Sequence, residues 1–447
     1  MVEEIEQVDT IAALATPPGR GGIGVVRISG MQVPQIALTI TGKTLQPRQA
    51  TFTYFSAING DILDQGIALY FPAPHSFTGE PVLELQGHGG TIVMDQLLQA
   101  VLAQGARLAR PGEFSERAFL NNKIDLAQAE AIADLIDSAS VQAAKCALRS
   151  LQGEFSAHIH NLVQQLTELR AYIEAGIDFV EEEIDLLADN QVTEQIMTLM
   201  RTVEMVLAKA QQGYLLKEGA RLALVGEPNV GKSSLLNQLA GRDTAIVTPI
   251  PGTTRDVVQA QIQLDGIPLH IMDTAGLRET TDLVELEGIR RTQQALAEAD
   301  IVILLLDDRY ADDYTYAPLL TDISKTALIV HNKIDLSGHT SGLDANGILH
   351  ISAKTGDGIM MLKQYLKEKI GVDTTVEGNF MARRRHLEAL QQAYTSLNFA
   401  LSQAQSRQSE LLAEELRLAQ HALAEITGEV TTDDLLSLIF STFCIGK

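Results

Sequence analysis

Apolar residues recur at spacings of three and four in two stretches of the chain, residues 116–216 and residues 381–440. Glycine is sparse and proline is absent in the first stretch. This spacing places apolar side chains on one face of a helix, so both stretches are expected to form long packed helices. The repeat is carried by residues such as Ile159, Leu162, Leu166, Leu169, Leu412, Leu416 and Leu423.

Residues 11–111 show a mixed pattern instead. One helix is predicted over residues 91–105, because Thr91 can cap its start and Gly105 can end it. The other predicted elements of this stretch are short β-like runs, separated by glycine and proline. They cover residues 24–28, 51–58, 67–71 and 82–85. We therefore predict a compact α+β domain.

Short apolar strands alternate with helical stretches over residues 220–371. This alternation predicts a parallel sheet with helices on both faces. Because helical stretches flank this α/β segment, we hypothesise that it is inserted into a single helical domain. The predicted strands cover residues 221–225, 269–272, 301–306, 327–330 and 348–351.

Composition narrows the class of protein. The chain has 447 residues with 45% hydrophobic content, enough for roughly three domains. The sequence has no run of about 18 apolar residues, and its acidic start lacks the pattern of a signal peptide. The only cysteines are Cys146 and Cys444, so a disulfide framework is not expected. These features predict a cytoplasmic protein that does not cross a membrane.

The formal net charge of −23 argues against broad electrostatic binding to nucleic acid, which needs a basic face. A local basic patch is still compatible with this charge. The densest basic cluster is residues 383–385, and a solvated helix face is the favoured interpretation of it.

Residues 226–233 (GEPNVGKS) fit the phosphate-binding motif G-x-x-x-x-G-K-[ST]. They directly follow a predicted strand and open a predicted helix, which is the context that the motif requires. Backbone N–H groups of such a loop converge on the β-phosphate. Lys232 is expected to reach the β- and γ-phosphates, and Ser233 is expected to bind Mg²⁺.

Three further motifs follow predicted strands in the order expected of a guanine-nucleotide site. Residues 273–276 (DTAG) can hold Mg²⁺ through Asp273 and present the Gly276 N–H to the γ-phosphate. In residues 332–335 (NKID), Asp335 can accept hydrogen bonds from guanine N1–H and the exocyclic amine, a donor pair that adenine lacks. Residues 352–354 (SAK) can support the base from its other side. The set resembles the translation-factor-like branch of Ras-type GTPases.

The means of hydrolysis is less clear from the motifs. Where Ras-like proteins carry a water-orienting glutamine this chain has Leu277, so it either hydrolyses GTP slowly or recruits another group. Glu285 and Glu287 are candidates, although each is also a plausible solvated helix acid. Asn229, inside the phosphate loop, can help bind a monovalent cation that supplies the positive charge of an arginine finger.

The whole chain resembles the MnmE (TrmE) family of tRNA modification GTPases. The match includes residues 15–22 (ATPPGRGG), 83–90 (LELQGHGG) and 110–115 (RPGEFS), besides the GTPase motifs. It also includes the C-terminal residues 443–447 (FCIGK), which are highly diagnostic.

The resemblance implies a multidomain α+β and α/β fold. A folate-binding, aminomethyltransferase-like dimerisation domain is expected over residues 1–118. A discontinuous α-helical domain is expected over residues 119–216 and 374–447, with a Ras-like P-loop GTPase domain inserted over residues 217–373. Members form homodimers and act with the flavoprotein MnmG in a heterotetramer. Together they install an aminomethyl or carboxymethylaminomethyl group at C5 of the wobble uridine of certain tRNAs, with a formyl- or methylene-tetrahydrofolate as carbon donor and with Mg²⁺ and K⁺ as cofactors.

The resemblance also assigns roles to residues. Mg²⁺ is expected on Ser233 and Thr254, and K⁺ on Asn229 and oxygens of Thr248, Ile250 and Thr253. Glu285 is expected to be the catalytic acid that positions water. The implied folate contacts are Arg27, Glu84, Lys123 and Lys447, and Cys444 occupies the position of the family's C-terminal cysteine. The implied GTP contacts are Asn229, Val230, Gly231, Lys232, Ser233, Ser234, Thr248, Pro249, Ile250, Pro251, Gly252, Thr253, Thr254, Asp273, Thr274, Ala275, Gly276, Asn332, Lys333, Asp335, Ser352, Ala353 and Lys354.

One departure and two alternatives accompany this interpretation. The loop over residues 248–251 contains two prolines, but proline retains the carbonyl oxygens that ligate an ion. A regulatory GTPase switch in ribosome or RNA maturation would carry a similar GTPase domain without the folate-like domain. A folate-dependent transferase in which GTP only regulates is the second alternative.

Overall fold

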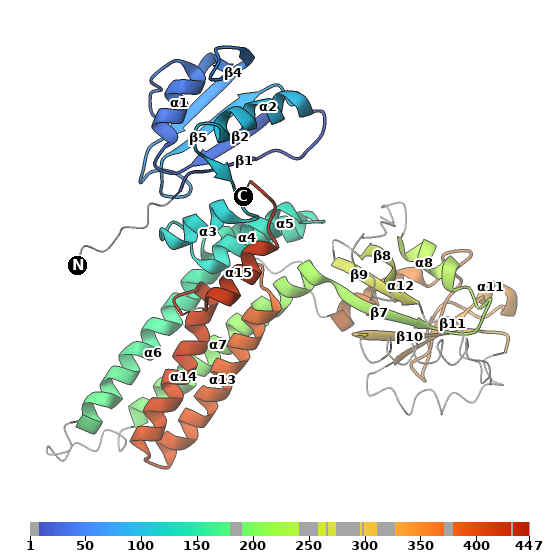
Figure 1. The fold of residues 1–447 in the computed structure, drawn as a ribbon. Coiled ribbons are helices and arrows are strands. Elements are labelled where there is room, and N and C mark those ends of the chain that lie inside the picture. Colours follow the sequence, from blue (N-terminus) through green and yellow to red (C-terminus); the bar gives the residue numbers. More distant parts are fainter. Residues whose placement is uncertain are drawn as a thin grey trace, which may run out of the picture. The chain divides into compact units, whose positions relative to one another are not determined.

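A computed structural model describes the structure of the protein at residues 9–178, 190–240, 258–264, 267–273, 296, 299–310, 327–370, 379–430 and 432–446. The chain forms two compact units, shown in Figure 1. The first comprises Met1–Ala133, Ser150–Met200 and Gln392–Lys447. The second comprises Asp134–Arg149 and Arg201–Gln391. Each unit is therefore assembled from segments that are far apart in the sequence.

The N-terminal part of the first unit is a six-stranded sheet with the order β3-β4-β5-β2-β1-β6. Neighbouring strands are antiparallel except for the parallel pair β1 and β6. Helices α1 and α2 pack against the sheet over a buried apolar cluster that includes Val26, Leu85 and Leu97. The strands are Ile11–Leu14 (β1), Gly24–Ser29 (β2), Thr51–Ser56 (β3), Ile62–Phe71 (β4), Val82–Gly87 (β5) and Arg107–Leu108 (β6), and the helices are Val33–Thr41 (α1) and Thr91–Leu102 (α2).

The predicted α+β domain is confirmed, but several of its elements differ from the prediction. The helix predicted over residues 91–105 ends at Leu102, its N-cap is Gly90 rather than Thr91, and its C-cap is Ala103 rather than Gly105. The strands β1 and β6 were not predicted.

β4 begins at Ile62, five positions before the predicted start at residue 67. Helix α1 was not predicted, although its Val33, Ile36 and Ile40 are buried at helical spacing. Pro34 lies in its first turn, where the missing N–H of proline is tolerated, and Gly42 ends it in the left-handed region.

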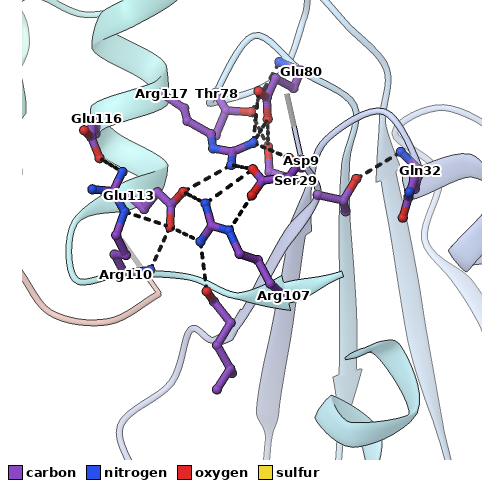
Figure 2. A network of polar contacts seen from close by, with 12 residues as sticks. Asp9, Ser29, Gln32, Thr78, Glu80, Arg107, Arg110, Glu113, Glu116 and Arg117 are labelled. Atoms are coloured by element: carbon purple, nitrogen blue, oxygen red, sulfur yellow. Dashed lines mark hydrogen bonds and ion pairs between the residues drawn. The ribbon is translucent and has the colours of Figure 1, made fainter. Parts of the chain in front are cut away.

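A network of ion pairs ties α3, Glu113–Leu120, to the edge of this sheet, as Figure 2 shows. Glu113 is 2% exposed and accepts hydrogen bonds from Arg107 Nη1 at 2.9 Å and from Arg117 Nη2 at 3.1 Å. Arg117 also binds Asp9 at 2.7 Å and Glu80 at 3.2 Å. Burial alone would raise the pKa of Glu113, but the hydrogen bonds from Arg107 and the Arg110 backbone lower it below its usual value.

The remainder of the first unit is helical, as the periodicity predicted. α6, before the GTPase motifs, packs against α14, which follows them. Arg170 donates a 2.6 Å hydrogen bond to Gln420, and Gln420 donates one of 3.0 Å to Thr167. Helices from before and after the α/β segment thus pack together in the first unit, as predicted. The expected bounds of the helical domain, residues 119–216 and 374–447, differ from the division into units, because Asp134–Arg149 and residues 201–216 belong to the second unit. The helices of the two helical stretches are Leu126–Ile136 (α4), Val141–Leu151 (α5), Glu154–Asp178 (α6), Asn190–Glu218 (α7), Arg384–Gln405 (α13), Ser409–Thr427 (α14) and Asp433–Ser441 (α15).

The second unit contains a seven-stranded sheet with the order β12-β13-β11-β10-β7-β9-β8. The five strands from β13 to β9 are parallel, which confirms the predicted α/β fold, whereas β8 and β12 add antiparallel edges. The strands are Ala220–Val225 (β7), Val258–Leu264 (β8), Ile267–Asp273 (β9), Ile301–Asp307 (β10), Ala327–Asn332 (β11), Gly342–Leu343 (β12) and Leu349–His350 (β13).

Apolar residues cover both faces of this sheet because side chains alternate along each strand. Ile303 and Leu305 join a cluster with residues of helices α8, Lys232–Ala240, and α12, Ile359–Ile370. Val302 and Leu304 join a second cluster on the opposite face. The segments expected to cover that second face lie mostly outside the described residues.

Close packing of α7 gives a test of the fold. A Cβ at Gly213 would lie 1.8 Å from the Phe380 carbonyl oxygen. Alanine in a helix normally stabilises by about 1 kcal/mol relative to glycine. Here we expect Gly213→Ala to lower the free energy of unfolding by about 1–3 kcal/mol through overpacking. Urea unfolding followed by circular dichroism measures this, with the exposed Gln211→Ala as control. A Gly213→Ala protein as stable as the control would contradict the packing described here.

Candidate functional site

The phosphate-loop motif runs from the end of β7 into the first turn of α8. Two of its glycines are required by close contacts. A Cβ at Gly226 would lie 2.4 Å from the Leu305 carbonyl, and one at Gly231, whose φ is +104°, would lie 2.3 Å from Asn332 Nδ2. Asn229 also adopts a positive φ of 66°, which asparagine tolerates better than most residues. The sequence therefore folds here into a tight loop that leads into a helix N-terminus.

Lys232 lies within this loop. Its Nζ donates hydrogen bonds to the carbonyl oxygens of Gly226 at 2.6 Å and Glu227 at 3.1 Å. These contacts hold the ammonium group over the loop whose N–H groups would bind phosphate. Ser233 and Ser234 follow in the first turn of α8, where the helix dipole favours an anion.

Asn332 connects three segments that are far apart in sequence. It is 2% exposed, its Nδ2 donates to the Val230 carbonyl at 2.7 Å, and its Oδ1 accepts from the Ala353 N–H at 2.8 Å. The phosphate loop, residues 332–335 and residues 352–354 are therefore joined through a single side chain. This is the arrangement expected of a site that binds the base and the phosphates of one nucleotide.

The predicted guanine-reading acid has a defined orientation. Ser352 Oγ donates a 2.7 Å hydrogen bond to Asp335 Oδ1 and also accepts one from the Thr355 N–H at 3.2 Å. One carboxylate oxygen of Asp335 is thereby held by Ser352. Fixing a carboxylate in advance favours a ligand that presents two matched donors, as guanine does.

Lys333 is anchored by a residue to which the sequence analysis gave no role. Its Nζ donates a 2.8 Å hydrogen bond to Asp307 Oδ2, at the end of β10. Hydrogen bonds from Arg309, and then from Lys333, hold the pKa of Asp307 well below its usual range despite partial burial. In the sequence, the position of Asp307 at the end of a buried apolar strand could have marked it as a candidate site residue. Its pairing with Lys333 could not be predicted in the same way, because the two residues are 26 positions apart.

Part of the predicted nucleotide site lies outside the described residues. This applies to the switch-loop residues Thr248, Pro249, Ile250, Pro251, Gly252, Thr253 and Thr254, to Thr274, Ala275 and Gly276, and to Glu285. The backbone of Asp273 ends β9 and pairs in register with Leu224, next to the strand that precedes the phosphate loop. The side chain of Asp273 is not among the described ones.

Two of the predicted folate contacts meet in the first unit. Arg27 on β2 and Glu84 on β5 are paired in register, and Arg27 Nη2 lies 2.9 Å from Glu84 Oε1. Arg27 Nη1 also donates to the Gly446 carbonyl at 3.2 Å, and its guanidinium lies 5.9 Å from the centroid of the Phe114 ring. The two side chains remain 24% and 19% exposed. A paired cation and acid thus lie beside the C-terminal segment.

The C-terminal segment reaches this position because its aromatic residues are buried. Phe443 and Phe440 have ring centroids 5.4 Å apart and pack with Leu126. A Cβ at Gly446 would lie 2.3 Å from the Leu14 carbonyl, so only glycine fits there. Cys444 is exposed, and Lys447 lies outside the described residues.

The last predicted folate contact, Lys123, lies in the turn that follows α3. It lies beside Gly79, since a Cβ at Gly79 would be 3.1 Å from Lys123 Cε. Next to Gly79, Thr78 contacts Ser29 Oγ at 2.7 Å, two positions along β2 from Arg27. The structure thus brings Arg27 and Glu84 together and places Lys123 on a neighbouring loop.

Asn332 gives a direct test of the joined site. Asn332→Ala leaves the Val230 carbonyl and the Ala353 N–H without their partner, which costs about 1–3 kcal/mol for each buried group. We expect the variant to bind a fluorescent GDP analogue at least about tenfold more weakly than the wild-type protein. Asn346→Ala, at an exposed position in the same unit, is the control. Equal affinities of the two variants would show that the three segments are not held through Asn332.

The described helices include none that is long and apolar enough to cross a membrane. Among solved structures, an Era variant of Aquifex aeolicus bound to GDP and AlF4⁻ is 26% identical and covers 40% of this chain, with a TM-score of 0.26. This chain spans 66% of that Era chain, just under two thirds. The FeoB G-domain of Methanococcus jannaschii is 22% identical and covers 34% of this chain and 97% of its own, with a TM-score of 0.27.

Family models match nearly the whole chain. A model of the MnmE helical domain matches residues 126–444. A model of the N-terminus of the GTP-binding protein TrmE matches residues 10–123. The phosphate-loop motif and the predicted base-binding residues described above lie within the first match. The chain belongs to the MnmE (TrmE) family.

Proposed function

We propose that this chain is a potassium-stimulated GTPase that modifies C5 of the wobble uridine of certain tRNAs together with a flavoprotein partner. A one-carbon tetrahydrofolate is the proposed donor for the aminomethyl or carboxymethylaminomethyl group. The observation that supports the folate step best is the partly exposed pair of Arg27 and Glu84 beside the C-terminal segment. Its chemistry matches a ligand that carries both carboxylates and a ring with N–H donors.

The carboxylates and the pterin ring of a folate would contact different residues of this site. The carboxylates would pair with Arg27, Lys123 and Lys447, and the pterin N–H groups would donate to Glu84. Arg27 Nε and Nη2 both donate to Glu84 Oε1, and Nη1 donates to the Gly446 carbonyl, so these contacts orient the guanidinium. The remaining N–H groups of Nη1 and Nη2 would donate to a folate carboxylate. The one-carbon donor supplies the carbon of the new group, and Cys444 is a nearby exposed residue of the same segment.

In the proposed GTPase site, the residues of the second unit bind and orient the nucleotide. Lys232 would exchange its carbonyl partners for the β- and γ-phosphates, which are stronger acceptors. Asp335, held by Ser352, would accept the guanine N–H groups. Mg²⁺, held by Ser233 and Thr254, would neutralise the phosphate charge when bound.

Hydrolysis requires a substitute for the missing glutamine and for an arginine finger. Glu285 is the proposed acid that positions the attacking water. Asn229, which is exposed and has a positive φ in the phosphate loop, offers a side-chain carbonyl next to the phosphate site. Together with oxygens of Thr248, Ile250 and Thr253 it would bind K⁺, whose charge stabilises the transition state. Pairing of two GTPase domains in a cytoplasmic homodimer completes the proposal.

Potassium dependence is the test of the hydrolysis mechanism. We expect KCl to accelerate GTP hydrolysis about tenfold or more over NaCl at equal ionic strength, because the ion supplies charge at the transition state. Asn229→Ala is expected to lose most of this acceleration, and Asn346→Ala to keep it. Phosphate release measured in both salts distinguishes them. Equal rates in KCl and NaCl for the wild-type protein would exclude the ion mechanism.

The folate step is tested in tRNA. Cells that lack this protein are complemented with the wild-type gene, with Arg27→Gln or with Arg48→Gln, an exposed arginine of the same domain. We expect Arg27→Gln to abolish the modified wobble nucleoside and to weaken calorimetric binding of formyl-tetrahydrofolate about tenfold or more, since an ionic hydrogen-bond partner is lost. Arg48→Gln is expected to restore the nucleoside. Normal wobble nucleosides in the uncomplemented cells would refute the proposed function.

A further inference from the structure

A group of histidines converges on Asp308, one position beyond the end of β10. Its members are His331 on β11, His350 on β13 and His339, which follows the short helix α11, Ile334–Ser337. The side chain of Asp308 is 0% exposed, while His331 and His350 are 12% and 16% exposed. His339 is 62% exposed and is the member of the group that faces the solvent.

The nitrogen atoms that face Asp308 are of the same kind in all three rings. Asp308 Oδ1 lies 3.2 Å from His331 Nδ1 and 3.0 Å from His350 Nδ1, and Oδ2 lies 2.7 Å from His339 Nδ1. One ligand atom each from Asp308, His331 and His350 lies within 4.8 Å of the others. The rings are arranged edge to face, with centroids 5.0 Å apart for His331 and His350 and 5.6 Å apart for His339 and His350.

These distances are close to those around a tetrahedral metal ion. With metal–ligand bonds of about 2.0–2.1 Å, two ligand atoms of a tetrahedral zinc site lie about 3.3 Å apart. The distances from Asp308 Oδ1 to His331 Nδ1 and His350 Nδ1, 3.2 Å and 3.0 Å, lie close to this value. His339 Nδ1 contacts the other carboxylate oxygen at the shorter distance of 2.7 Å, so His339 would have to shift to join the three clustered ligand atoms. Three imidazoles and one carboxylate are a donor set that suits Zn²⁺ and neighbouring first-row ions rather than Mg²⁺ or Ca²⁺.

An outer contact supports the same interpretation. His350 Nε2, the nitrogen that points away from Asp308, lies 3.7 Å from Asp344 Oδ2. The Asp344 carboxylate is held by the N–H groups of Asn346 at 2.9 Å and Ile348 at 2.8 Å. Metal-binding histidines commonly direct their second nitrogen to a carboxylate, which fixes the tautomer and the ring. In addition, Ser337 Oγ donates to Asp308 Oδ2 and orients the central carboxylate.

We propose that Asp308, His331, His339 and His350 bind one divalent transition-metal ion, with Zn²⁺ as the best match. The ion would fix the ends of β10, β11 and β13 to the loop that carries His339. His331 immediately precedes Asn332, and Asp308 N–H donates a 2.9 Å hydrogen bond to the Asn332 carbonyl. The proposed metal site would therefore adjoin Asn332, the residue that joins the three nucleotide segments. It would involve none of the phosphate, base or folate contacts described above.

Cobalt binding to the full-length protein tests the proposal directly. The chelator-treated protein is titrated with Co²⁺ in the presence of excess Mg²⁺. We expect one equivalent to bind, with the visible bands of a four-coordinate ion and without the near-ultraviolet band of cysteine ligation, and Zn²⁺ to displace it. Zn²⁺ is also expected to raise the unfolding temperature by mass action. No saturable binding below about millimolar metal would overturn the proposal and leave Asp308 as a hydrogen-bonded carboxylate only.

Matched variants distinguish this site from other histidines. His339→Gln is chosen because His339 is exposed, so the fold does not depend on it. We expect His339→Gln to bind Co²⁺ about tenfold or more weakly, since even outer partners of metal ligands contribute that much. His421→Gln, on α14, is the control. Equal binding by the two variants would refute the site, and circular dichroism checks that both are folded. These readouts do not depend on GTP hydrolysis.

Discussion

The parallel pairing of β7, β10, β11 and β13 determines where chemistry can occur in the second unit. Because these strands run in the same direction, the residues that follow them meet at one edge of the sheet. The phosphate loop follows β7, Asp307 and Asn332 are the last residues of β10 and β11, and residues 352–354 come shortly after β13. The buried side-chain amide of Asn332 links these residues into one site. It makes one hydrogen bond to the phosphate loop and another to Ala353.

Sequence patterns predicted most of this unit because its signals are local. A glycine-rich loop between a strand and a helix is readable from eight consecutive residues, and each later motif directly follows an apolar run. The pattern did not predict the antiparallel strand β8, whose position depends on pairing with β9 rather than on its own sequence. The partner of Lys333 was also missed, because the contact of Lys333, the residue after β11, with Asp307 at the end of β10 depends on strand register.

The N-terminal domain was predicted less completely for a related reason. Arg27 and Glu84 were selected by family resemblance alone, and nothing in their local sequence marks them. Their contact follows from the register of β2 and β5, which places them opposite each other on one face of the sheet. The contact with Gly446 needs the two ends of the chain to meet, and this depends on the burial of Phe440 and Phe443. Such contacts over long sequence separations cannot be derived from periodicity.

Two consecutive acids at the end of β10 show how one strand can serve two sites. Asp307 is the last residue of β10 and Asp308 is the first residue of the turn that follows, and their side chains meet different surroundings. Asp307 pairs with Arg309 and Lys333, and is thereby tied to the nucleotide segment. Asp308 contacts His331, His339 and His350. The two groups therefore share a sheet edge without sharing a side chain. It also means that an ion on Asp308 would act on the base-reading residues through the backbone of β11, since His331 and Asn332 are adjacent.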